Sequence, residues 1–374
     1  MTEIQLPYYL QFTIKLIMIL LIGTFIYLGQ DILVPLAFST LLAIVLLPFT
    51  NFLERKKIPK TFANLIAVIT ALIIVGGILY FFSFQITKFL RDIPSIKTHL
   101  TQHYNAMQNW MQQKLHISNE SQTTLFNNAA EKVKDSGTMY IRQTFLTITQ
   151  MIFLIALITV YTFFILYYRH TIRKFIIAVF KKAHTPKVNE VLTESKNIIQ
   201  KYIIGLLIEM VIVAIAISAV LLIIGVKYAI FFGVLTAILN IIPYIGFFIC
   251  IGFTVLVTLT TTDQLNSIIW IIVGMEAVHF ADANFLMPNV VGSKVKINAL
   301  VTIISALIGA TLVGISGIFL ALPTIAILKI IFDRVDGLKP WGEMMGEEKR
   351  TKIFSRKVKH VILNKPAVKQ NSQI

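Results

Sequence analysis

Long uninterrupted apolar runs constrain most strongly what this chain can fold into. A helix needs about 20 apolar residues to cross the hydrocarbon core of a bilayer, and several runs reach that length. Hydrophobic residues make up 56% of the 374 residues and charged residues only 14%, which excludes an ordinary soluble domain. We therefore predict an all-α integral membrane protein. About six full transmembrane helices are expected, at residues 8–29, 32–49, 62–82, 145–168, 205–225 and 268–287.

The basic residues predict how these helices are oriented. The formal net charge is +16, but the placement of this charge argues against nucleic acid as a partner. Lys and Arg concentrate in a short loop at 51–60, in 169–201 and in a tail at 333–374, as the positive-inside rule expects of cytoplasmic segments. We predict that both termini are cytoplasmic and that the tail contacts anionic membrane lipid.

A polar segment at 83–144, which we call the arm, separates the third and fourth expected helices. It carries seven basic and four acidic residues, a weaker basic bias than the loops, so we place it outside the cytoplasm. Apolar residues recur at intervals of three and four residues from Ile86 to Met111, which predicts an amphipathic helix. Its apolar stripe needs a covering surface: its own return helix, the membrane surface or a neighbouring subunit. We expect a homo-oligomer in which the arm contributes contacts.

These patterns divide the chain into four parts. They are N-terminal transmembrane helices at 1–82, the extracytoplasmic helical arm at 83–144, a transmembrane transport core at 145–332 with a cytoplasmic helix at 169–201, and a basic cytoplasmic tail at 333–374. The single cysteine, Cys250, lies in an apolar run, and we interpret it as a buried structural thiol.

Two apolar stretches are interrupted in the middle, which predicts two broken or re-entrant helical hairpins. The first runs from 228 to 259 and the second from 299 to 332. The expected breaks are at Asn240, Pro243 and Gly246 in the first stretch, and at Gly314, Ser316 and Gly317 in the second. Hairpins that enter from opposite faces and reach the midplane are typical of secondary transporters with inverted repeats. Two full crossings would give the same charge pattern, so charge does not distinguish a hairpin from a pair of spans.

Polar residues inside these apolar runs are the candidate site. Glu276, His279 and Asp282 lie along one slanted stripe of a helix, and Asn284 follows them. Ionisable groups are costly in a bilayer and are therefore functional candidates, with interfacial or structural roles as the alternatives. The Asn240 amide and the Ser316 hydroxyl either line a solute site or satisfy a local turn. Glu209 lies near the start of its expected span, where an interfacial position is expected.

The pattern D-x-N-x-L-x-P-x-x-x-G spans Asp282–Gly292, and G-x-x-G-x-x-L-A-x-P spans Gly314–Pro323. Together with the Pro243–Gly246 turn, these motifs resemble the autoinducer-2 exporter family of bacterial multi-pass membrane transporters. That family usually has Glu at the position of Asp282 and often a proline in 296–300, where this chain has none. The resemblance implies a secondary transporter of the bacterial cytoplasmic (inner) membrane, exporting a small polar solute such as a signalling molecule.

Two alternatives stay open. Intramembrane carboxylates also suit a monovalent cation/proton antiporter. A non-transporting membrane scaffold would instead act through the arm. The sequence shows no nucleophile motif, phosphate-binding loop or metal-binding motif, so no enzyme, cofactor or metal is expected. His99 and His103 are four residues apart on the arm helix, but they lack a neighbouring carboxylate and are interpreted as solvated.

Overall fold

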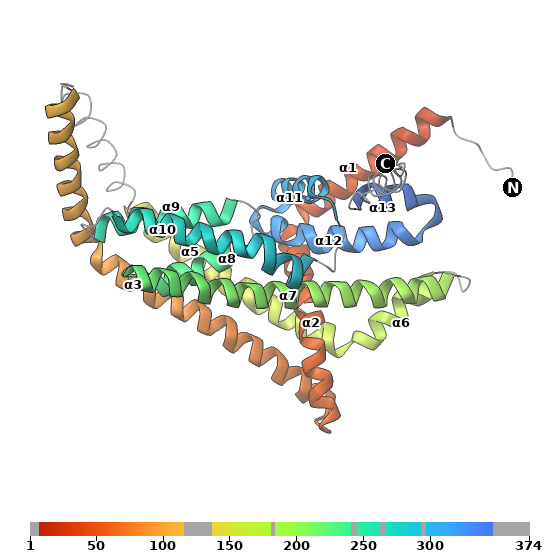
Figure 1. Cartoon of the computed structure of the whole chain (residues 1–374). Helices are drawn as coiled ribbons and strands as arrows, with labels where there is room; N and C mark the ends of the chain where they lie inside the picture. Colours follow the sequence, from red (N-terminus) through yellow and green to blue (C-terminus); the bar gives the residue numbers. More distant parts are fainter. Residues whose placement is uncertain are drawn as a thin grey trace, which may run out of the picture.

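The structure is a computed structural model that describes residues 7–115, 137–180, 184–240, 245–261, 266–292 and 297–346. Within these residues all regular secondary structure is helical, which confirms the predicted all-α class (Figure 1). Six of the described helices are long and apolar enough to cross a membrane, and a bent pair would make a seventh.

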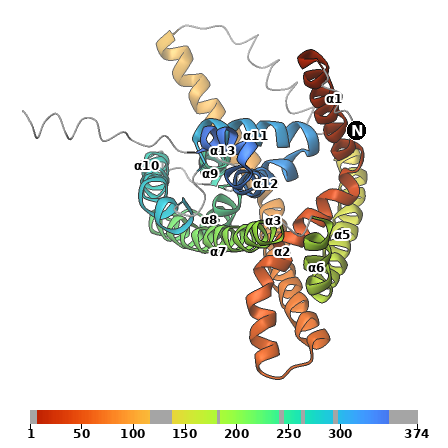
Figure 2. The ribbon, with the colours of Figure 1, turned by 90° about the vertical axis from the view of Figure 1, so that its right-hand side faces the viewer.

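The N-terminal part begins with three consecutive helices. They are α1 (Tyr8–Leu28), α2 (Gln30–Arg55) and α3 (Lys60–Leu115). Helix α2 packs between α3 and the later helix α5 (Gly137–Tyr167) around Ala43, Val68 and Leu166. Helix α1 has no buried residue, and Figure 2 shows it at the side of the helical core. Its apolar surface must therefore face lipid or another chain.

Helix α3 joins the membrane to the arm without interruption. It is 56 residues long and stays helical through Pro94. Its first 30 residues, to Phe89, are apolar enough to span a membrane. The described part of the arm on α3 is therefore a helical continuation of a transmembrane helix, and Figure 1 shows it changing direction between its orange and gold parts. Residues 116–136 of the arm, where a return helix would begin, lie outside the described residues.

Two segments predicted to be cytoplasmic lie on the same face of the structure. Helix α5 ends at Tyr167, and α6 (Arg169–Val179) leaves it at an angle of 72°. At this corner Arg169 pairs with Glu54 at 2.6 Å, and the Lys60 ammonium donates to the Tyr167 carbonyl at 2.5 Å. The loop at 51–60 and the beginning of 169–201 thus pack together, and their cytoplasmic location stays a prediction.

Helix α7 (Thr185–Ile224) is the long central helix of the part at 145–332. Its second half packs against α8 (Ala229–Leu239) and α10 (Asn266–Ala281), and α9 (Ile245–Thr261) packs in turn on α8 and α10. This main core contains Ile217, Phe232, Phe247, Ile271 and fully buried Cys250, which confirms the interpretation of the thiol as buried. Helix α8 has only 11 residues, short for a crossing and suited to half of a re-entrant hairpin.

The second interrupted stretch forms α11 (Ala299–Val313) and α12 (Ile315–Arg334), which fold back on each other. The turn is at Gly314, whose φ of 66° and ψ of −147° favour glycine. Helix α11 has 15 residues, but α12 has 20, longer than the short half-helix expected and enough to cross a membrane alone. A short C-terminal helix, α13 (Lys339–Met345), packs on α12.

Ion pairs show that the two hairpins begin at opposite ends of α7. At the start of α7, Glu190 and Glu194 pair with Arg334 at the end of α12. Beyond the other end of α7, Lys227 precedes α8 and pairs with Asp92 at the base of the arm. A helix of 40 residues is about 60 Å long, so the bases of the two hairpins are far apart (Figure 1).

Candidate functional site

Three polar side chains from three different elements meet inside the core. The amide nitrogen Nδ2 of Asn240 donates to Asp282 Oδ2 at 3.0 Å and to Glu209 Oε1 at 3.4 Å. Because one NH₂ group carries two protons, a single amide serves both carboxylates. We call Glu209, Asn240 and Asp282 the polar cluster.

Local structure explains how each member reaches this point. Asn240 follows the last residue of α8, and its backbone N–H donates to the Thr236 carbonyl at 2.8 Å, so its side chain is available for other contacts. The residues that follow, including Pro243, lie outside the described residues. The backbone at Gly246 lies close to the Leu239 carbonyl oxygen, since a Cβ atom at position 246 would be 1.7 Å from that oxygen. Glycine at 246 therefore lets α9 begin beside the end of α8.

Asp282 stands where α10 changes its helical winding. The helix continues as two π-helical segments, at Asp282–Leu286 and Pro288–Gly292. The Met287 N–H donates to the Asp282 carbonyl, the five-residue spacing of a π-helix. Such segments often mark functional sites, because the local change of winding redirects side chains. Here the Asp282 side chain faces α7 and the end of α8.

Both carboxylates of the polar cluster are almost completely buried. Glu209 is 4% exposed and Asp282 is 5% exposed. Among the described residues, Glu209 Oε2 and Asp282 Oδ1 have no hydrogen-bond partner. A buried charge is costly unless it is paired, and two neighbouring carboxylates repel each other when both are ionised. The cluster therefore favours a bound proton or a small cation, and its oxygen ligands suit a hard cation.

The sequence-predicted stripe on α10 runs from the exposed to the buried side of the helix. Glu276 is exposed, His279 is half-buried and Asp282 is buried. The His279 ring stacks on Phe247 of α9, with ring centroids 4.1 Å apart and planes inclined by 16°. Asn284 is exposed and donates to the Phe280 carbonyl at 2.8 Å, which gives it a local structural contact. Transport roles for Glu276, His279 and Asn284 stay predictions.

The breaks in the second hairpin make a different kind of contact. A Cβ atom at Gly317 would lie 1.9 Å from the Gly309 carbonyl oxygen, so α11 and α12 touch backbone to backbone. This contact places Gly317 between the two helices of the hairpin, and Ser316 beside it is half-buried. The sequence also predicts that Gly314 and Ser316 meet the break at Asn240. That meeting stays a prediction.

Glu209 is the member that the sequence reasoning missed, because it was expected at the interface. The reason is that α7 begins at Thr185, well before the apolar run, so Glu209 lies more than halfway along the helix. A signal was present in its spacing. Glu209 lies on the same row as Gly205, Val213 and Ile217, all buried and four residues apart. A carboxylate within an otherwise apolar, buried row indicates a polar site in the core.

A multi-pass helical protein with two interrupted hairpins and a buried polar cluster belongs to the class of membrane transporters. Comparison with known proteins gives the family: the sequence pattern of AI-2E family transporters matches residues 16–337. The chain belongs to the AI-2E transporter family. The resemblance seen in the 282–292 and 314–323 motifs is thereby confirmed.

Curated relatives are similar over most of their length and are named only as candidate transport proteins. YrrI of Bacillus subtilis is 24% identical over 312 residues, which cover 81% of this chain and 86% of YrrI. YueF of the same organism is 27% identical over 317 residues, covering 80% of this chain and 82% of YueF. A relative from Haemophilus influenzae is 22% identical over 346 residues, covering 89% of this chain and 95% of that protein.

Proposed function

We propose that this chain is a secondary transporter of the bacterial cytoplasmic membrane that exports a small polar solute, with the polar cluster as its coupling site. The observation that carries the proposal is the Asn240 amide shared by two buried carboxylates at the end of a half-helix. Both termini are placed in the cytoplasm, because the basic loops and the basic tail then all lie on that side.

The coupling step follows from the cost of burying charge. With a proton or a cation bound, the Glu209 and Asp282 carboxylates are compensated and the end of α8 stays closed against α7 and α10. When the ion leaves, repulsion between the carboxylates weakens the two hydrogen bonds to Asn240. The α8–α9 hairpin then moves more readily, because the closed arrangement has lost the stabilisation that the ion-bound cluster adds.

Flux in liposomes of the purified protein tests this proposal. A panel of small polar solutes is loaded, and efflux is measured with and without imposed proton and sodium gradients. Solute efflux that accelerates with one of the gradients supports the proposal. Liposomes without the protein provide the control for leak. Efflux equal to that control for every solute and every gradient would contradict it.

A monovalent cation/proton antiporter is the second candidate. The observation that favours it is that two carboxylates, rather than one, share the Asn240 donor, since exchange of a cation for a proton needs a site that binds either. The same liposomes distinguish the two functions. An antiporter moves protons in response to a sodium or potassium gradient with no organic solute present, whereas a solute exporter does not.

The alternative to a transport function is a membrane scaffold that acts through the arm. It predicts that deleting the arm abolishes function in cells while Asp282→Asn has no effect, the reverse of what a transporter predicts.

We also propose that the chain forms a homo-oligomer, since α1 exposes an entire apolar helix and the arm carries an apolar stripe. Mass measurement in detergent at several protein concentrations tests this, and a strict monomer throughout would exclude it.

A further inference from the structure

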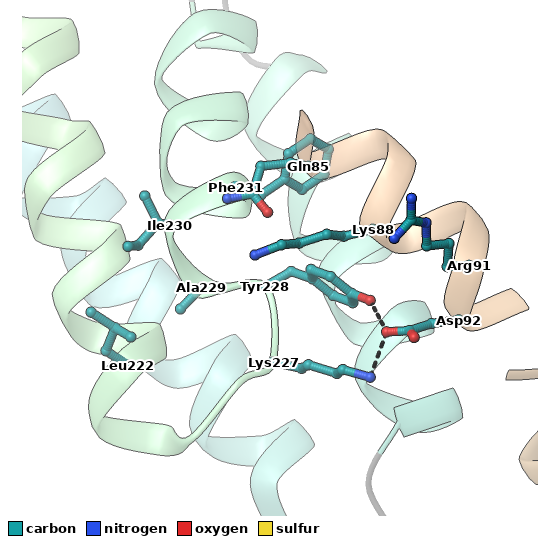
Figure 3. A pocket seen from close by; sticks show the side chains of 10 residues that line it. All are labelled: Gln85, Lys88, Arg91, Asp92, Leu222, Lys227, Tyr228, Ala229, Ile230 and Phe231. Carbon is teal, nitrogen blue, oxygen red and sulfur yellow. Dashed lines mark hydrogen bonds and ion pairs between the residues drawn. The ribbon is translucent and has the colours of Figure 1, made fainter. Parts of the chain in front are cut away.

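A cationic cavity of about 450 Å³ lies at the end of α7 next to the arm, away from the polar cluster. It forms where α3 leaves the membrane and α8 begins. Figure 3 shows Lys88 and Arg91 projecting from α3, and Lys227 reaching in from the loop between α7 and α8. The remaining lining residues are Gln85, Asp92, Leu222, Tyr228, Ala229, Ile230 and Phe231.

One side of the cavity is held in place by a hydrogen-bonded network. The Asp92 carboxylate pairs with the Lys227 ammonium at 2.5 Å and accepts a hydrogen bond from the Tyr228 hydroxyl (Figure 3). The hydrogen bonds from Lys227 and Tyr228 lower the pKa of Asp92, so this carboxyl group is charged at neutral pH. Desolvation and the bond to Asp92 raise the pKa of Tyr228, which keeps its hydroxyl protonated as a donor. The network ties the base of the arm to the start of α8.

The cavity has a surplus of positive charge. Three basic side chains face one carboxylate, and Asp92 already pairs with Lys227. Lys88 packs over the Phe84 ring at 4.5 Å, and this contact leaves its ammonium hydrogens available to an anion. The first turn of α8 adds further donors. Ile230 and Phe231 in this turn line the cavity, and the first N–H groups of a helix have no acceptor within the helix.

We propose that this cavity binds a phosphate group, held by Lys88, Arg91 and the first turn of α8. Arg presents a planar pair of donors that matches phosphate oxygens, and Lys adds a mobile point charge. The side chains next to the cations favour a phospholipid headgroup over a free phosphate. Leu222 and Ile230 are 57% and 49% exposed, so they offer an apolar surface where acyl chains would lie. The ligand class is therefore an anionic glycerophospholipid.

A bound headgroup would act as a clamp between two parts of the fold. Lys88 and Arg91 belong to α3, whereas the N–H groups belong to α8, the first half of a hairpin that carries Asn240 at its other end. A phosphate between them adds contacts across the same junction that Asp92 and Lys227 already bridge. Lipid composition would then influence how readily α8 moves. This site is independent of which solute the chain transports.

Thermal unfolding of the full-length protein in neutral detergent tests the proposal. The protein is titrated with phosphatidylglycerol, phosphatidylcholine or inorganic phosphate. Phosphatidylglycerol is expected to raise the Tm saturably and phosphatidylcholine is not. The double variant Lys88→Gln with Arg91→Gln should shift the titration midpoint by about tenfold or more, since two charge-assisted hydrogen bonds are lost. Lys174→Gln, which removes one exposed charge from α6, is the control and should titrate as wild type.

Comparison of the titrations distinguishes the two sources of phosphate. Stabilisation by phosphatidylglycerol alone identifies a lipid site, and stabilisation by inorganic phosphate as well shows that the phosphate group itself is the main contact. If the double variant unfolds too early for titration, Lys88→Gln alone and native mass spectrometry of co-purified lipid replace it. Equal stabilisation by both lipids, or an unchanged midpoint in the variants, would overturn the proposal.

Discussion

The side-chain amide of Asn240 lies 3.0 Å from Asp282 Oδ2, although 42 residues separate them in the sequence. The contact joins the end of the half-helix α8 to the point where α10 becomes π-helical. Movement of either element must break this bond inside the core, where water does not readily replace it. The pair is therefore the natural place to test whether ion binding and hairpin movement are linked.

Asp282→Asn keeps the size of the side chain but removes its charge. We expect gradient-driven flux to fall by about tenfold or more, the equivalent of one charge-assisted hydrogen bond of about 1.5–3 kcal/mol. Folding and some downhill exchange should persist, because an amide still forms hydrogen bonds. Asp282→Glu should keep activity, since the family usually has Glu there. Flux of each variant and of the wild type is measured in liposomes under the same imposed gradient. An Asp282→Asn variant whose flux follows the gradient as the wild type does would exclude a coupling role for Asp282.

Glu209→Gln should impair the same step as Asp282→Asn, because both carboxylates share the Asn240 donor. The double variant should then lose little more flux than either single variant, which corresponds to a coupling free energy of about 0.5–3 kcal/mol between the two positions. Glu343→Gln is the matched control, since Glu343 is an exposed glutamate on α13, outside the candidate site. Strictly additive losses for Glu209 and Asp282 would show that they act separately.

Gly317→Ala tests the close packing of α11 on α12. The added Cβ would lie 1.9 Å from the Gly309 carbonyl oxygen, so the helices must separate. We expect a destabilisation of about 1–3 kcal/mol, as for overpacked cores, together with a marked loss of flux, and a larger effect from Gly317→Val. Gly252→Ala is the control, because a Cβ atom there meets nothing within 4 Å. Thermal unfolding and flux are measured on the same preparations, and normal values for both Gly317 variants would contradict this packing.

The orientation in the membrane is tested with single cysteines in a Cys250→Ser background. Gln108→Cys on the arm, and Asn119→Cys in the part outside the described residues, should react with a membrane-impermeant thiol reagent in whole cells. Lys174→Cys on α6 should react only after the cells are opened, because the basic segment 169–201 is predicted to be cytoplasmic. The reverse pattern would invert the proposed topology.

Acid should weaken the junction between the arm and α8 through Asp92. Its pKa is lowered below the ordinary 3.8 by its hydrogen bonds to Lys227 and Tyr228. The stabilising contribution of a carboxyl group with a lowered pKa is complete above its unfolded value and is lost as the pH falls through its folded value. The difference in Tm between wild type and Asp92→Asn should therefore be constant from pH 7 to about 5 and shrink below about 4. A difference that grows on acidification would refute this assignment.

The helices were predictable because length and apolarity alone identify spans. The turn at Gly314 and the short α8 followed from glycine and from interrupted apolarity. Asn240 and Asp282 were also identifiable, since polar groups inside apolar runs are costly. Their contact was not, because it depends on how α8 and α10 pack against α7.

Glu209 and Glu276 show where sequence reasoning ends. Hydropathy placed Glu209 near the start of its span, and the packing of α8 and α10 against α7 buries it beside Asn240. Glu276 lies on the same predicted stripe as Asp282, yet Glu276 is exposed and Asp282 is buried. Depth along a helix is readable from sequence, whereas the face that meets a neighbour is set by tertiary packing.

The unbroken course of α3 has a mechanical consequence. About 26 residues extend beyond the membrane-spanning part, which corresponds to a rod of about 39 Å. Because the helix stays continuous through its change of direction, a change of about 10° in the tilt of the spanning segment would swing the far end of the arm by about 7 Å. The arm is thus a lever that magnifies small rearrangements in the bilayer. A pair of spectroscopic labels at its tip would report them as distance changes large enough to measure.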